Sequence, residues 1–167
     1  IKPLSFPLTV NINIKKEILY DLSRTIEILE VREAKDLEEL KTLSDHAIED
    51  VAVHKDLDLI SVTVLIYSLY KMGGGLTAGD YDSILTELRK ARQSLQQGNL
   101  SKYNRSIKTL YVLVQKCNVK VQEHLQDVMQ AARIKKGTAL LEKGLSIGQA
   151  AGLMGLSNWD LQQYAAK

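Results

Sequence analysis

The sequence predicts an all-α protein, in which a helical bundle follows an extended N-terminal arm and precedes a C-terminal helix-turn-helix. Apolar residues recur at helical spacing from residue 15 to residue 132. Segments containing Gly and Asn interrupt this pattern, and small residues mark a sharp turn near the end of the chain. We therefore expect an arm at 1–14, a bundle at 15–131 and a helix-turn-helix module at 132–167.

The N-terminal segment contains both prolines of the chain, and it then alternates apolar residues with asparagines. Val10, Ile12 and Ile14 are separated by Asn11 and Asn13. A period of two residues indicates a short strand or an extended arm. A mobile terminus is an equally good interpretation of this segment.

Two amphipathic helices are expected next. Ile18, Leu22 and Ile26 continue a spacing of four residues and indicate a first helix at about 15–30. A second apolar series, from Leu37 to Val51, indicates a helix at about 33–54. The interruption between the two series lies near residue 31.

The segment "DLDLISVTVLIYSLYKM" is compatible with two structures. Asp56 is a good N-cap, and apolar residues on every side suit a buried central helix. Its β-branched residues, with apolar side chains at alternate positions from Ile60 to Ile66, would also suit a strand. We predict a helix, because helices surround the segment, and the glycines at 73–75 should end it.

The remaining bundle is expected to contain a fourth helix and one long fifth helix. The fourth runs from about Asp80 to Gln96 and stops at Gly98 and Asn99. From Tyr103 to Ala132, apolar residues alternate in steps of three and four and form a heptad-like seam. The seam could pack within one chain or against a second copy, and we favour a two-fold homodimer.

Charge is distributed unevenly along the chain. Residues 15–58 contain 13 acids and 7 bases, whereas residues 87–120 contain 8 bases and one acid. The uneven distribution indicates either one basic face or two halves that attract each other. The single cysteine, Cys117, fits a reducing compartment, and no apolar run approaches the roughly 20 residues of a membrane span. We expect a cytoplasmic protein without membrane contact.

The closing segment, "LSIGQAAGLMGLSNWDLQQYAAK" at 145–167, has the pattern of a helix-turn-helix. Ala151 allows the two helices to approach closely, and Gly155 suits the turn between them. Ser146 and Ser157 can cap the first and second helix, and Leu161 supplies an apolar inner face.

The second helix of this motif would present polar side chains to DNA. Asn and Gln can pair with adenine in the major groove, and Ser can bind phosphate. The outward-facing residues are Ser157, Asn158, Trp159, Gln162 and Gln163. The lysines expected to bind phosphates are Lys135, Lys136, Lys143 and Lys167. Because the helix contains Asp160 and no Arg, a degenerate motif that contacts a protein is the alternative.

At these positions the chain resembles the short helix-turn-helix of prokaryotic, especially archaeal, antitoxin-type regulators. The matching residues are Ser146, Ile147, Ala150, Ala151, Leu153, Gly155, Leu156, Ser157 and Leu161. The resemblance covers about 35 residues and implies a toxin partner such as a PIN-type ribonuclease. The bundle of the first 130 residues is larger than the remainder of the usual antitoxin.

A second candidate site lies in "SDHAIEDVAVHKDLD", where His46, Asp50 and His54 are spaced four residues apart and could bind zinc. We favour a solvated helix flank, with His54 at the edge of the core and bonded to Asp50. We expect no bound metal, because the histidines lack a third inward-facing ligand, and we expect no cofactor.

The sequence has no phosphate-binding loop, no nucleophile elbow and no cysteines at metal-ligand spacing. We therefore expect a non-enzymatic regulator that binds DNA through residues 146–167 and a protein partner through the bundle. The alternatives are an adaptor or inhibitor that masks a partner without touching DNA and, third, a metal-dependent hydrolase around His46–Asp58.

Overall fold

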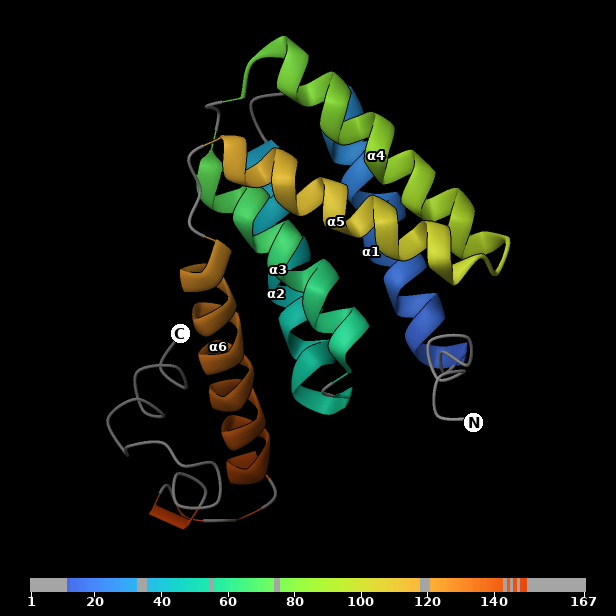
Figure 1. The fold of residues 1–167 in the computed structure, drawn as a ribbon. Helices are drawn as coiled ribbons and strands as arrows, with labels where there is room; N and C mark the ends of the chain where they lie inside the picture. The colour runs from blue at the N-terminus through green and yellow to red at the C-terminus, as the bar shows by residue number, and fades with distance from the viewer. Residues whose placement is uncertain are drawn as a thin grey trace.

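The computed structural model describes residues 12–32, 36–54, 56–73, 76–117 and 121–142, and also residues 144, 146, 148 and 149. Of residues 121, 122 and 137–142 it describes the backbone alone. The described residues form six helices and contain no strand (Figure 1). The helices are α1 (Ile12–Val31), α2 (Asp36–His54), α3 (Leu57–Met72), α4 (Ala78–Gln96), α5 (Leu100–Lys116) and α6 (Val121–Glu142). The prediction of an all-α bundle is confirmed.

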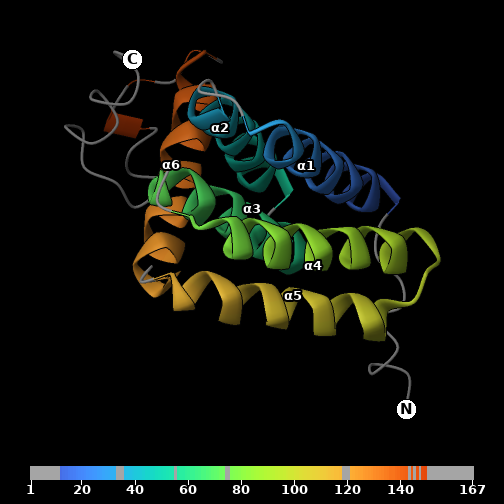
Figure 2. The same ribbon diagram turned by 90° about the horizontal axis from the view of Figure 1, so that it is seen from above.

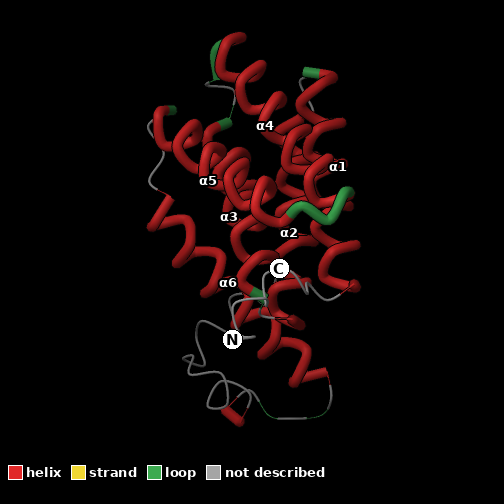
Figure 3. Tube along the Cα trace, turned by 45° about the vertical axis from the view of Figure 1, so that its right-hand side comes forward, coloured by secondary structure: helices red, strands yellow, loops and turns green. Residues whose placement is uncertain are grey.

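Helix α3 lies at the centre of the bundle, where it packs against α1, α2, α5 and α6. Figure 2 shows α4 and α5 running antiparallel side by side, and α1 packs against α4 and α2. Short loops join the helices wherever the chain between them is described (Figure 3). The central position of α3 explains why its apolar residues are not confined to one side.

The ambiguous segment at 57–72 is a helix, as predicted. Asp56 is its N-cap, and the Asp56 carboxylate accepts hydrogen bonds from the backbone N–H groups of Asp58 and Leu59 at 2.9 and 3.1 Å. Gly73 follows the helix with φ of +63°, which glycine tolerates better than any other residue. The segment is buried against several neighbouring helices, and this packing stabilises the helix more than the β-branched residues disfavour it.

Capping residues mark the ends of α4 and α5, which form a helical hairpin. Thr77 and Asp80 form a capping box at the start of α4, in which each side chain accepts from the other residue's backbone N–H. Gly98, with φ of +75°, and Asn99, the N-cap of α5, form the turn between the helices. The predicted end of the fourth helix at Gln96 is confirmed.

The expected long fifth helix is two helices. Helix α5 ends at Lys116, Cys117 is its C-cap, and α6 begins at Val121. The intervening sequence "CNVK" begins with three residues of low helix propensity. A separate α6 can therefore pack against α2 and α3, where Ser68 Oγ lies 2.8 Å from His124 Nδ1.

The heptad-like seam is buried within one chain on these two helices. Tyr103 and Leu110 of α5 and Val128 of α6 are buried, whereas Leu125 is 42 % exposed. The seam therefore no longer supports the expected homodimer, since its apolar surface is already covered.

The last three residues of the expected extended arm are helical. Residues 12–14 belong to α1, and Ile14 is buried on the same face as Ile18 and Leu22. The spacing of four residues that joins Ile14 to the helix outweighs the alternation with asparagine. Residues 1–11 lie outside the described part.

The structure describes only the beginning of the C-terminal motif. The backbone N–H of Gln149 donates to Ser146 Oγ, and the backbone N–H of Ser146 donates to Gln149 Oε1. This reciprocal pair has the pattern of a capping box, and the expected role of Ser146 as the cap of a helix-turn-helix stays a prediction. Residues 150–167 lie outside the described part, and α6 runs through the boundary expected at 131/132. Among the described helices, none has both the length and the apolarity of a membrane span.

Candidate functional site

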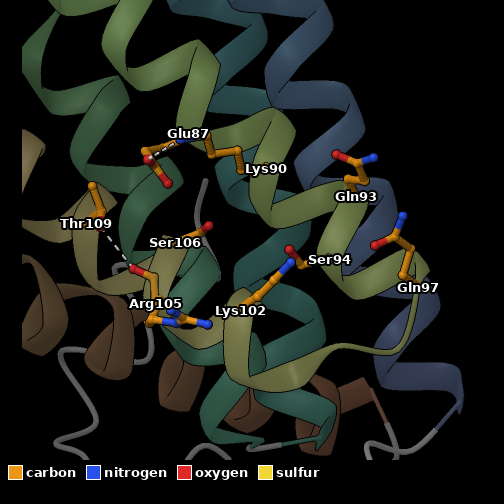
Figure 4. Close-up of a pocket in the computed structure, with 9 residues that line it drawn as sticks. All are labelled: Glu87, Lys90, Gln93, Ser94, Gln97, Lys102, Arg105, Ser106 and Thr109. Carbon is orange, nitrogen blue, oxygen red and sulfur yellow. Dashed lines mark hydrogen bonds and ion pairs between the residues drawn. The ribbon is translucent and has the colours of Figure 1, made fainter.

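An open groove of about 570 Å³ lies between α4 and α5. Figure 4 shows its residues on facing turns of the two helices. Three bases, one acid and five uncharged polar residues line it: Lys90, Lys102, Arg105, Glu87, Gln93, Gln97, Ser94, Ser106 and Thr109. This composition suits a negatively charged, hydrogen-bonding ligand rather than an apolar one.

Two of the three bases in this groove remain without an acidic partner in the described structure. Glu87 lies 3.6 Å from Lys90, but neither Lys102 nor Arg105 forms an ion pair with a described residue. Both are exposed on the first two turns of α5. The groove therefore has a positive charge that the bundle itself does not neutralise.

Both explanations of the uneven charge distribution hold in part. Arg89 of the basic half pairs with Glu30 of α1 at 2.5 Å, and Lys135 of α6 lies 3.5 Å from Glu49 of α2. These ion pairs join acidic and basic parts of the chain at the surface. In the groove between α4 and α5, Lys102 and Arg105 stay open to a ligand.

The structure describes two of the residues expected to bind DNA. Lys135 is on α6, and only 17 % of its side chain is exposed beside Glu49. Lys136 is half-buried on the same helix. The others lie outside the described residues: Lys143, Ser157, Asn158, Trp159, Gln162, Gln163 and Lys167.

A second polar site joins α1 to α2. Glu17, His46 and Asp50 each offer one ligand atom, and these atoms lie within 4.8 Å of one another. His46 Nε2 is 3.4 Å from Glu17 Oε2 and 3.3 Å from Asp50 Oδ2. The His46 ring also contacts Tyr20 edge-to-face, with ring centroids 5.3 Å apart. His46 and Asp50 are one turn apart on α2 and face Glu17 on α1.

Asp21 is the buried neighbour of this cluster. It follows Glu17 by one helical turn, its exposed fraction is 0 %, and neither carboxylate oxygen has a hydrogen-bond partner. Burial, then the charge of Asp50 and then that of Glu17, raises the pKa of Asp21 to about 8. A buried carboxylate without partners costs several kcal/mol when ionised, so this group requires a proton or a cation.

Asp50 shares this environment. Burial, with the neighbouring Glu17, raises its pKa to about 7, although the charge of His46 acts in the opposite direction. Asp50 Oδ2 has no hydrogen-bond partner, even though His46 Nε2 is nearby. The hydroxyls of Ser44 and Tyr103 are also buried without a partner, so unsatisfied polar groups are concentrated in this part of the bundle.

The expectations for the histidines need two corrections. His54 is exposed rather than at the edge of the core, and Asp50 pairs with His46 instead. The reason for expecting no metal was also wrong, because Glu17 of α1 supplies the third neighbouring ligand. A signal was present in the sequence: Asp21 lies among Ile18, Leu22 and Thr25, at a core position of an amphipathic helix.

A pocket of about 390 Å³ opens beside His46. Its lining comes from one face of α1 and one of α2: Tyr20, Arg24, Glu38, Glu39, Thr42, Leu43 and His46. Of the carboxylate–histidine cluster, only His46 lines this pocket.

Comparison with protein-family models, curated proteins and solved structures finds no match to this chain. The function is therefore argued from the two sites themselves.

Proposed function

We propose that this protein is a non-enzymatic, nucleic-acid-binding regulator. In this proposal the C-terminal helix-turn-helix reads DNA sequence, and the α4–α5 groove adds contacts with phosphates. The observation that supports it is the pair of exposed bases, Lys102 and Arg105, in a groove whose other residues are amides, hydroxyls and the ion pair of Glu87 with Lys90. Arg and Lys bind phosphate through charge-assisted hydrogen bonds, and amides and hydroxyls add neutral ones.

The groove answers the main objection to DNA binding by the C-terminal motif. A helix-turn-helix with few bases binds weakly, because phosphate contacts supply much of the affinity for DNA. A basic groove on the same chain would provide such contacts. In the antitoxin-like form of this proposal, a toxin nuclease binds elsewhere on the bundle.

The test measures binding of the untagged chain to duplex DNA at two salt concentrations. The duplexes are the region upstream of its own gene and a random sequence. Replacing Lys102 and Arg105 together with Ala should weaken binding to both duplexes and lower the salt slope by about 2 units, at about 0.9 per phosphate contact. Lys41→Ala removes an exposed base from the acidic helix α2 and is the matched control.

Sequence reading is tested separately in the C-terminal motif. Gln162→Ala should cost roughly 1–3 kcal/mol on the preferred duplex and reduce the preference over random DNA. Lys136→Ala should weaken binding to all duplexes equally and lower the salt slope of binding by about one unit. The proposal fails if wild type shows no preference for its own upstream DNA and the groove variants keep the wild-type salt slope.

An adaptor that masks a protein partner is the second candidate. The observation that favours it is an exposed apolar pair at the α2–α3 junction, where Val53 is 73 % and Leu57 is 80 % exposed. Replacing both with Ser should weaken capture of the partner encoded next to this gene without changing DNA binding. An unchanged affinity for that partner would remove this candidate.

A further inference from the structure

We propose that Glu17, His46 and Asp50 bind one divalent transition-metal ion, with Asp21 as the buried charge behind the ligands. This inference is independent of DNA binding, since the cluster lies on α1 and α2 and the basic groove on α4 and α5. It assigns a binding site and no reaction.

The separations of the ligand atoms fit a metal centre. Zinc lies about 2.0–2.2 Å from nitrogen and oxygen ligands, so two ligands at the tetrahedral angle are about 3.4 Å apart. The two separations from His46 Nε2 are 3.4 Å to Glu17 and 3.3 Å to Asp50. The third, between the two carboxylates, is no longer than 4.8 Å.

Asp21 is the second, independent observation. It is fully buried, neither of its oxygens has a hydrogen-bond partner among the described residues, and it lies one helical turn from Glu17 on α1. Besides His46, no cationic side chain of the described residues pairs with any of the three carboxylates. A dication bound between these carboxylates would neutralise their like charges.

The chemistry of the ligands selects the class of ion. One imidazole with carboxylates suits zinc, iron(II) or manganese(II), whereas magnesium and calcium prefer oxygen ligands alone. The side chains of His46 and Glu17 are 45 % and 34 % exposed, so water can complete the coordination. Tyr20 contacts the imidazole ring and holds its orientation.

The test uses the full, untagged chain after removal of metal with a chelator. Zn²⁺ is titrated by calorimetry, and Co²⁺ is followed by its visible absorbance. Wild type should bind one ion per chain, and Tm should rise by about 5–10 °C at a hundredfold excess of free metal over Kd.

Variants distinguish metal binding at this site from metal binding at other histidines. Asp21→Asn should lower affinity about 10–100-fold, the effect of losing an outer-shell partner. His46→Gln and Glu17→Gln should lower it further and abolish the rise in Tm. His54→Gln changes an exposed histidine two turns along α2 and should leave both quantities unchanged.

Loss of binding in Asp21→Asn cannot come from unfolding, because asparagine can be buried without ionising or taking up a proton, so the metal-free variant should be at least as stable as wild type. Three results would each overturn the proposal: no saturable binding by wild type, equal affinity in wild type and His46→Gln, or an equal loss in His54→Gln. Tighter binding of Mg²⁺ than of Zn²⁺ would exclude the imidazole ligand and overturn it as well.

Discussion

Replacing Asp21 with asparagine should remove a pH dependence from the stability of the metal-free protein. The pKa of Asp21 is about 8 in the folded chain, against 3.8 for the unperturbed group. Between pH 5 and pH 7 the folded carboxyl group keeps its proton, whereas the unfolded one loses it. The folded state thus binds one proton more, and the free energy of unfolding falls as pH rises.

The magnitude follows from the linkage between protons and folding. One pKa unit corresponds to about 1.4 kcal/mol, so Asp21 alone should remove about 3 kcal/mol of stability between pH 5 and pH 7. Asp50, with a pKa raised to about 7, acts in the same direction. The other titratable groups around the two carboxyl groups are Glu17, His46, Glu49 and the Tyr103 hydroxyl. Asparagine does not titrate, so the variant should become more stable than wild type as pH rises.

The assay is urea unfolding at pH 5, 6 and 7 with a chelator present. The free-energy difference between Asp21→Asn and wild type should grow by about 3 kcal/mol across this range. Asp45→Asn, which changes an exposed carboxylate on α2, should follow the wild-type curve. Parallel curves for Asp21→Asn and wild type would refute the reasoning, because Asp21 would then be ionised in the folded chain.

Two further predictions concern the packing of the bundle. Leu88→Ala should cost about 2–5 kcal/mol in urea unfolding, because Leu88 is 2 % exposed and its loss leaves a cavity. Val112→Ala, at a 52 % exposed position on α5, should change stability by less than about 0.5 kcal/mol, and equal effects of the two would contradict the burial of α4. Tyr111→Phe should cost about 0.5–1.5 kcal/mol, since the Tyr111 hydroxyl donates a 2.8 Å hydrogen bond to the Ser61 carbonyl. Tyr20→Phe, at an exposed position, is its control, and no difference between the two would show that the bond to Ser61 contributes nothing.

Local features of the sequence were sufficient to predict most of the bundle. The apolar periods of α1 and α2, the cap at Asp56 and the stop at Gly98 are each decided by neighbouring residues. Two predictions about the helices were wrong: residues 12–14 were assigned to the arm, and α5 and α6 were expected to be one helix. In both places the local sequence signals conflict. The seam from Tyr103 to Ala132 continues in register through residues of low helix propensity, and periodicity alone cannot indicate that the helix ends there.

The two sites were decided by tertiary structure. Sequence spacing placed His46 beside Asp50, but Glu17 is 29 residues away from His46, and only the packing of α1 on α2 brings them together. Likewise, the excess of bases at 87–120 was visible in the sequence, whereas the pairing of Arg89 with Glu30 and the opening around Lys102 depend on how α4 and α5 pack. Helical periodicity reports which side of a helix is buried, but it does not report which helix lies opposite. The choice of partner depends on the packing of the whole core, and ligands that come from two helices are determined only there.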